Sequence, residues 1–225
     1  MPGRSQRASA VLLSRRMRVL RASQGVVGGL ARRPGRWPVR HFPVTSVPFP
    51  TLSAGPIRLR RFQLHDVTAV VAAGADPVTP LVSSVPPNCS APEAAAFVER
   101  QRHSFQDGTG YSFAIADARS DRALGGLGLW LRDADLGRTS VGYWVLSEAR
   151  RTGVAGRALD AACAWAHRTL GIPRIELYVE PWNVASIRTA EHVGFVCEGL
   201  VRSWEEVDGE RRDMLMFSLL ASDRP

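Results

Sequence analysis

The architecture follows from residues 143–159, which read Tyr143-Trp144-Val145-Leu146-Ser147-Glu148-Ala149-Arg150-Arg151-Thr152-Gly153-Val154-Ala155-Gly156-Arg157-Ala158-Leu159. An apolar strand ends here, small residues follow, and a helix begins near Val154. The first turn of a helix offers unpaired backbone N–H groups and the positive end of the helix dipole, so it suits a pyrophosphate. Small residues keep the backbone accessible to such an anion and nearby arginines add positive charge: Gly153, Ala155 and Gly156, with Arg150, Arg151 and Arg157. The plainer alternative is a glycine-rich helix start with solvated arginines.

Two common nucleotide-binding motifs do not fit this chain. A Walker loop requires Lys, and all 29 basic residues here are Arg. The nearby Gly125-Gly126-Leu127-Gly128 lacks the spacing of a dinucleotide fingerprint and lies inside an expected strand. The stretch therefore indicates a phosphate site of another class.

Strand and helix patterns alternate along the rest of the sequence. We predict strands over residues 57–62, 111–117, 124–131, 139–146, 174–179, 200–207 and 210–219. We predict helices over residues 66–74, 92–104, 154–170 and 183–192. Short polar connections make residues 111–146 an antiparallel meander, and Asp208-Gly209 predicts a hairpin. The predicted fold is α/β (α+β), with a mixed, mostly antiparallel central sheet and flanking helices.

Positive charge is concentrated in the first part of the chain. Residues 1–65 hold 13 Arg and no acidic residue, whereas residues 66–225 hold 16 Arg and 21 acidic residues. Such a charge block is typical of a disordered tail. We therefore expect residues 1–50 to be an Arg-rich disordered leader. The alternative is that the true start lies downstream of residue 1, at Met17 or near residue 45. The apolar runs of the leader are too short for a secretory signal; a twin-arginine signal, a transit peptide and a nucleic-acid-binding arm are the weaker alternatives.

Cysteine and histidine patterns exclude several classes of site. The three cysteines form no CxxC pair, and the five histidines show no metal-ligand spacing. We expect a reducing, cytoplasmic compartment and no structural metal. No apolar run reaches the roughly 18 residues of a membrane span, so none is expected. The exclusive use of Arg over Lys is typical of a GC-rich genome and indicates a bacterial source.

Two blocks of sequence, in order, resemble the GNAT (Gcn5-related) N-acetyltransferase superfamily. Arg150-x-x-Gly153-x-Ala155 resembles its (Q/R)-x-x-G-x-(G/A) acyl-CoA signature. Residues 174–186 and 191–199 resemble its second block, in the form found in the ribosomal-protein alanine N-acetyltransferase branch. The resemblance covers about residues 57–220. It implies an acyltransferase domain over residues 55–221, with splayed central strands, acetyl-CoA as co-substrate and no metal.

The resemblance gives each candidate binding residue a role. The strand end Trp144, Val145 and Leu146 would run along the pantetheine arm. The backbone N–H groups of Arg151, Thr152, Gly153, Val154, Ala155 and Gly156 would hold the pyrophosphate, with Arg150 and Arg157 beside them. Asn183 would bind the arm of the co-substrate or fix the gap between the splayed strands, and Ser186 would lie near the sulfur. Helix capping is the alternative role for both residues.

Acetyl transfer from a thioester requires a neutral amine, a polarised carbonyl and a proton donor for the departing thiolate. Backbone N–H groups at the end of the central strand are expected to polarise the carbonyl. In many GNAT enzymes a Tyr on the last helix is the general acid that protonates the thiolate. Ala190 occupies that position here, so the resemblance assigns the acid role to Ser186. Ser140 stands roughly where the alanine branch has a Glu. The candidate bases are then Glu148 and Glu180, although either is equally an ordinary solvated charge.

The expected acceptor is a primary amine: a protein or peptide N-terminus, a polyamine or an aminoglycoside. In this family the last hairpin borders the acceptor, and here it is aromatic and acidic, with Trp204, Glu205, Glu206, Asp208 and Asp213. Trp130 and Trp182 are candidates for the acceptor pocket or for the core, and Trp144 for the core. A homodimer is left open. The rival hypothesis is a catalytically weak acyl-CoA-binding module.

Overall fold

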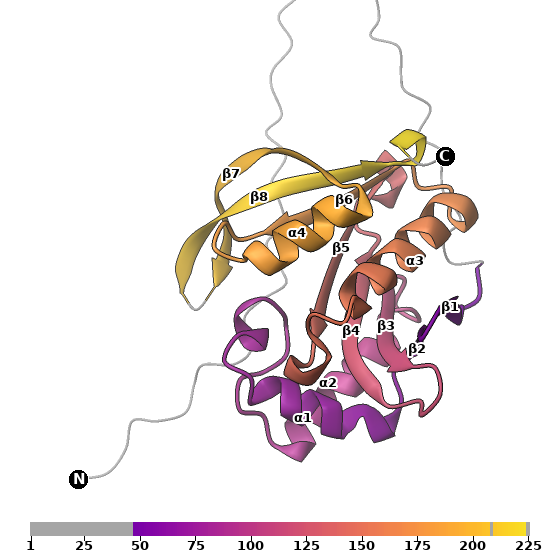
Figure 1. Cartoon of the computed structure of the whole chain (residues 1–225), viewed down its shortest axis with the longest axis vertical. Helices are drawn as coiled ribbons and strands as arrows, with labels where there is room; N and C mark the ends of the chain where they lie inside the picture. The colour runs from indigo at the N-terminus through magenta and orange to yellow at the C-terminus, as the bar shows by residue number, and fades with distance from the viewer. Residues whose placement is uncertain (1–46, 208, 224–225) are drawn as a thin grey trace, which may run out of the picture. The chain divides into compact units, whose positions relative to one another are not determined.

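An eight-stranded mixed sheet runs through the computed structural model, which describes residues 47–207 and 209–223 (Figure 1). The strand order is β1-β2-β3-β4-β5-β6-β8-β7, and every neighbouring pair is antiparallel except β5 and β6. The strands are β1 (Leu52–Ala54), β2 (Ile57–Arg61), β3 (Gly110–Asp117), β4 (Ala123–Trp130), β5 (Arg138–Val145), β6 (Arg174–Val179), β7 (Val196–Val207) and β8 (Glu210–Leu220). The helices are α1 (Val67–Gly74), α2 (Ala91–His103), α3 (Val154–Thr169) and α4 (Val184–Val193). The predicted fold class is confirmed.

Two apolar clusters hold helices against opposite faces of the sheet (Figure 1). On one face, the apolar stripe of α3 packs on the sheet through residues such as Leu159 and Cys163, which are fully buried. On the other face, α1 and α2 pack around Phe62, Phe97 and Trp144. Burying each large apolar side chain contributes about 1.5–3 kcal/mol, so each cluster fixes its helices firmly. Because β3 is buried on both faces, its sequence is a nearly continuous run of apolar residues.

Most predicted boundaries agree with the structure to within a residue or two, and two predictions were wrong. β1 was missed because three residues are too few to show a period. β7 begins at Val196 rather than Leu200, because two irregularities in its register with β8 break the alternation on which strand prediction depends. The predicted leader lies outside the described residues apart from its last few positions, so that prediction stays a prediction.

The central strands β5 and β6 are paired only where they begin. Their parallel ladder joins Arg138–Ser140 to Arg174–Glu176 and then stops. Beyond it, β5 stays paired with β4 as far as Val145, whereas β6 stays paired with β8 as far as Val179. The two strands therefore diverge toward their carboxyl ends, which is the splayed arrangement that the family resemblance implied.

Candidate active site

The divergence leaves one edge of β5 without a strand partner. From Val141 to Val145, β5 pairs with β4 on one side and has no ladder to β6 on the other. Backbone N–H and C=O groups on that open edge must find partners elsewhere, and an extended chain carrying amides can supply them. The predicted pantetheine-binding residues lie at this end of the strand. The Trp144 side chain is buried among α1 and α2, and the Leu146 N–H bonds the Leu124 carbonyl at 2.8 Å. The Val145 carbonyl accepts Arg150 Nε at 3.3 Å.

The start of α3 lies directly beyond this edge. Gly153 is the N-cap residue and has φ +79°, a left-handed conformation that glycine adopts without strain. No side chain caps the helix, and its first backbone bond runs from the Arg157 N–H to the Gly153 carbonyl at 3.1 Å. The N–H groups of the first turn therefore precede the helical ladder: Val154, Ala155 and Gly156. An uncapped first turn of this kind can accept an anion, and the phosphate site stays a prediction.

Positive charge surrounds the start of α3 on its exposed side. Arg151 and Arg157 are both exposed, and neither forms an ion pair with another residue in 47–207 or 209–223. Arg151 itself has φ +62°, which bends the chain sharply into the helix. A Cβ at Gly156 would approach only His192 and Val193, at 3.9 and 4.0 Å, so the backbone there is open. The site thus combines accessible amides with exposed cationic side chains.

The Arg150 side chain, predicted to lie beside the pyrophosphate, is engaged by the loop after α1. Its guanidinium donates to Asp76 Oδ1 at 2.6 Å and to Thr79 Oγ1 at 3.2 Å, both in the loop after α1. Burial would by itself raise the pKa of Asp76, but Arg150 and the Thr79 backbone lower it to about 2. Thr152, another predicted binding residue, donates its hydroxyl to the Ala149 carbonyl at 2.7 Å. Both side chains hold the loop in shape, so their contribution to an anion is through the backbone that they position.

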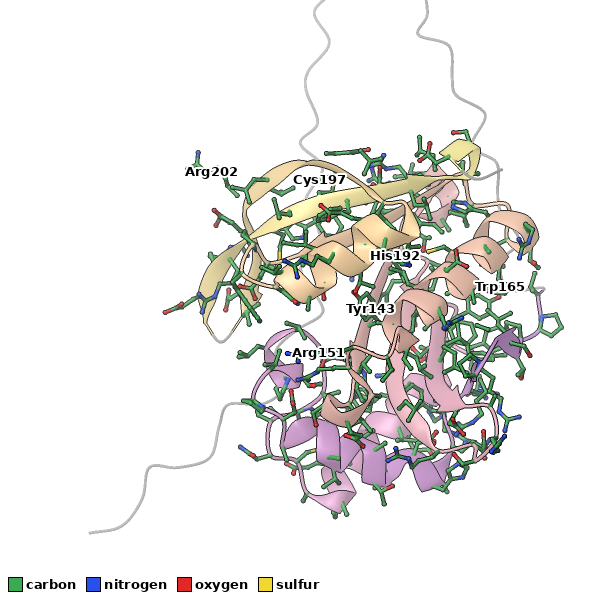
Figure 2. All side chains as sticks on the ribbon, in the orientation of Figure 1. Tyr143, Arg151, Trp165, His192, Cys197 and Arg202 are labelled. Atoms are coloured by element: carbon green, nitrogen blue, oxygen red, sulfur yellow. The ribbon has the colours of Figure 1, made fainter. Side chains whose placement is uncertain are left out.

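The start of α4 faces the open edge of β5 across the divergence. Asn183 caps the helix, accepting the Ser186 N–H on Oδ1 at 3.1 Å, so its capping role is realised. Tyr143, labelled in Figure 2, comes from β5, and the hydroxyls of Ser186 and Thr189 on α4 lie near its phenol. Burial raises the pKa of Tyr143, and these two hydroxyls partly offset the rise. Tyr143 is not among the site residues that the sequence patterns predict.

The two predicted bases occupy different environments. Glu148 is exposed and accepts Arg122 Nη1 at 3.1 Å. Its own backbone N–H and the Arg122 guanidinium lower its pKa, which makes it a weak base. Glu180 stands at the end of β6, close in sequence to the α4 turn, and accepts Trp182 Nε1 at 2.7 Å. The structure therefore gives Glu148 no support as a base, whereas Glu180 stays a candidate.

A small pocket of about 70 Å³ lies on the opposite face of β5, beside α2 and the loop after α1. The floor of the pocket is the backbone of β4 and β5, because Gly126, Gly128 and Gly142 carry no side chain there. A Cβ at Gly128 or Gly142 would lie 2.8–2.9 Å from the Trp130 ring, which extends over this floor and is 47% exposed. The lining contains no charged side chain; its other members include Phe62, Val82, Ser83, Ser84, Phe97 and Gln101. Trp130 is therefore a pocket wall, and Trp144 is core.

A carboxylate, that of Glu176 on β6, lies on the same face of the sheet as the Trp130 ring. Trp130 pairs with Ser140, and Ser140 with Glu176, so the three side chains share one face. Glu176 is 9% exposed and accepts Arg174 Nε at 2.8 Å and the Tyr178 hydroxyl at 2.9 Å. The chain thus carries a carboxylate on β6 next to the Ser140 position. The strand pattern gave no reason to select Glu176, because its neighbour across the ladder is unknown from sequence.

The last hairpin carries aromatic and acidic groups, and its Trp204 lies on the same face as Glu176. Trp204 of β7 stacks on Tyr178 of β6, with ring centroids 4.8 Å apart and an angle of 10° between the rings. Asp213 of β8 accepts the Ser203 N–H at 2.7 Å, and Trp182 is 49% exposed. Glu205 and Glu206 are exposed on the hairpin. Trp204, Glu205, Glu206 and Asp213 are exposed, whereas Asp208 lies outside the described residues. Trp182 lies outside the core and outside the pocket lining.

The part of the chain that the structure describes contains no group of three His, Cys, Asp or Glu residues arranged to hold a metal ion. Within the same residues, no helix has both the length and the apolar character needed to cross a membrane.

Comparisons with known proteins agree with this geometry. A family model described as the acetyltransferase (GNAT) domain matches residues 57–196. The N-acetyltransferase p20 of Bacillus licheniformis is 28% identical over 170 residues, covering 76% of this chain and 96% of p20. RimJ of Mycobacterium smegmatis, solved with CoA-disulfide, superposes with a TM-score of 0.69 at 24% identity, covering 79% and 90% of the two chains. A ribosomal-protein-S5-alanine acetyltransferase from Vibrio fischeri superposes with a TM-score of 0.63 at 17% identity, covering 78% and 99%. The chain therefore belongs to the GNAT family of N-acetyltransferases and is an acyltransferase enzyme.

Proposed function

We propose that this enzyme takes an acetyl group from acetyl-CoA and transfers it to the α-amino group of a protein or peptide whose first side chain is small and uncharged. The observation that carries the proposal is the pair of sites on opposite faces of one strand. An anion site and an open strand edge lie on the α3 and α4 side of β5, and an uncharged pocket lies on the α1 and α2 side.

Binding of acetyl-CoA rests on the backbone more than on side chains. The first-turn amides of α3 and the exposed Arg151 and Arg157 suit the pyrophosphate, since a helix N-terminus favours anions. The open edge of β5 offers amides to the pantetheine arm, next to Val145. The binding residues predicted from sequence are therefore carried forward, with Arg150 and Thr152 acting through the loop that they stabilise.

The chemistry of the pocket favours a peptide N-terminus over the other amine classes. Polyamines and aminoglycosides carry several cations, and a pocket lined only by uncharged groups offers them no carboxylate. Its volume of about 70 Å³ suits one small side chain rather than a whole ligand. Trp130, and Trp204 through its stacking on Tyr178, lie on one face of the sheet, and both rings are about half exposed. That face suits the backbone and the later residues of a polypeptide. Among the structural relatives, the S5-alanine acetyltransferase of Vibrio fischeri bears a name that refers to a ribosomal protein.

Transfer would proceed by direct attack of the amine on the thioester. Backbone N–H groups of β5 beyond the last β6 pair would polarise the carbonyl. Ser186 would donate a hydrogen bond to the departing sulfur from the first turn of α4. Glu180, at the end of β6, would take the amine proton through water. Holding the two reactants together supplies much of the rate enhancement.

A thiol-release assay with purified full-length protein tests the proposal. Peptides beginning with Ala, Ser, Arg or Asp, a polyamine and an aminoglycoside serve as acceptors, and mass spectrometry locates the acetyl group. We expect Ala- and Ser-peptides to exceed Arg- and Asp-peptides by at least about 10-fold in kcat/KM, because an unpaired buried charge costs more than about 1.4 kcal/mol. N-terminally blocked peptides are the matched control and should give no product. Binding of acetyl-CoA without turnover on any amine would instead support the rival binding-module hypothesis.

A further inference from the structure

One buried polar group at the site has no partner. The Tyr143 hydroxyl is completely buried and meets no hydrogen-bonding geometry with any of the described residues. The hydroxyls of Ser186 and Thr189 approach it closely enough to influence its pKa but do not form a hydrogen bond with it. An unpaired buried hydroxyl is costly, and buried polar groups in native proteins nearly always have a partner. Phenylalanine would fill the same space without that cost.

The position of Tyr143 shows which partner its hydroxyl would meet. It lies three residues beyond Ser140, the last residue of β5 that pairs with β6, on the open part of the strand. Alternation along β5 directs its side chain to the α4 face, whereas Gly142 and Trp144 face the acceptor side. A thioester in the divergence, attacked from the acceptor side, must expel its sulfur toward the α4 face. The phenol and Ser186 both lie on that side.

We infer that Tyr143 donates its phenolic hydrogen to the sulfur of the bound thioester and stabilises the thiolate as it leaves. The inference rests on the proposed function. The amine nitrogen forms a bond to the carbonyl carbon, the carbon–sulfur bond breaks, and its electron pair stays on sulfur. The proton lost by the amine goes to a carboxylate or to water. Sulfur departs as a thiolate that accepts hydrogen bonds from Tyr143 and Ser186, and it takes up a proton on release to solvent.

Two features suit Tyr143 to this role. Burial raises the pKa of Tyr143, which favours the protonated phenol that can donate a hydrogen bond. Ala190 leaves α4 without a phenol of its own, and Thr189 is committed to the Ala185 carbonyl at 2.8 Å. Ser186 alone would leave the developing charge with a single side-chain donor.

The substitution Tyr143→Phe separates a catalytic role from a structural one. We expect kcat with acetyl-CoA to fall by about 10- to 100-fold, the range for losing one hydrogen bond to a developing charge. The dissociation constant of acetyl-CoA should stay within about 2-fold of wild type, because hydrogen bonds to uncharged sulfur are weak. The melting temperature should be unchanged or higher, since the hydroxyl has no partner to lose. Tyr111→Phe is the matched control: its hydroxyl donates to the Val47 carbonyl at 3.2 Å in the core, so stability should fall with kcat unchanged.

The leaving group provides the decisive readout. An acetyl thioester of an electron-poor aromatic thiol forms a thiolate that needs little stabilisation. With this donor, the ratio of wild-type to Tyr143→Phe kcat/KM should shrink toward one. Equal losses with both donors, or a lower melting temperature matching the lost activity, would assign Tyr143 a structural role and overturn the inference. Turnover by the wild type tests the proposed function, and the ratio of wild-type to Tyr143→Phe kcat/KM tests the role of Tyr143. Failure of one hypothesis can therefore be told apart from failure of the other.

Discussion

Gly156→Glu should abolish most of the affinity for acetyl-CoA without disturbing the fold. Gly156 lies in the first turn of α3, where the amides precede the helical ladder. A side chain there has room, because the nearest atoms to its Cβ are on His192 and Val193, at 3.9 and 4.0 Å. Acidic residues are also favourable in a first turn. The substitution therefore adds a negative charge beside the proposed pyrophosphate site and leaves the helix intact.

The magnitude follows from Coulomb's law. Two like charges 4–6 Å apart at an effective dielectric of about 20 repel by roughly 3–4 kcal/mol. The turn is open to solvent at Arg151 and Arg157, so screening reduces this to about 1.5–3 kcal/mol. At about 1.4 kcal/mol per factor of ten, affinity should fall by roughly 10- to 150-fold.

Calorimetric titration with acetyl-CoA measures this loss, and three comparisons interpret it. Gly156→Gln has nearly the same shape without the charge and should lose clearly less affinity. Raising the salt concentration should narrow the gap between the two variants. S-acetylpantetheine, which lacks the pyrophosphate, should bind the wild type and Gly156→Glu alike. Normal acetyl-CoA affinity in a folded Gly156→Glu protein would show that the phosphate site is elsewhere.

Gly153 is the more obvious target from sequence but the poorer probe. Its φ of +79° costs about 1–2 kcal/mol for any residue with a Cβ, so the start of α3 would shift. A loss of binding there would mix backbone strain with electrostatic repulsion.

Three further predictions follow from contacts around the site. Gly142→Ala places a methyl group 2.9 Å from the Trp130 ring, so the acceptor KM should rise at least about 5-fold in steady-state assays with acetyl-CoA affinity unchanged; an unchanged KM would remove the pocket from the acceptor site. Asn183→Ala should lower unfolding free energy by about 1 kcal/mol in urea, and Asn183→Ser should restore it; if Ser restores stability but not acetyl-CoA affinity, Asn183 also contacts the ligand. Asp76→Asn should cost about 1–3 kcal/mol at pH 7. Because the pKa of Asp76 falls from 3.8 to about 2 on folding, its contribution is full above pH 3.8 and is lost as pH falls toward 2, so the variant and wild-type stability curves should converge in acid.

Local patterns were sufficient for most of the fold. The stripe from Ala158 to Ala166 and the stop at Gly171 located α3, and the Asp208-Gly209 pair located the turn between β7 and β8. These features depend on residues within one or two turns of each other, so sequence spacing contains them. β1 could not be predicted in this way, because three residues are too few to show the alternation of a strand.

Long-range partners account for what sequence did not reveal. Arg150 has the position of a phosphate-binding cation, but its partner Asp76 is 74 residues away and engages the guanidinium. Glu176 lies beside Ser140 only through the parallel ladder between β5 and β6. The pocket between α2 and the strands β4 and β5 is equally non-local. Gly128 and Gly142 look like ordinary strand glycines in the sequence, and only the structure shows that the Trp130 ring lies over them.

The register of β5 couples the two halves of the proposed reaction. Ser140, Gly142 and Trp144 face the acceptor side, and Tyr143 faces α4. A slip of one residue would exchange these sets, placing the phenol in the pocket and a glycine beside the sulfur. The ladder to β4 therefore has to be continuous, and it pairs six consecutive residues of β5, whereas three pairs with β6 suffice. Firm pairing on one edge sets which side chains meet each substrate, and the missing pairs on the other edge make room for them.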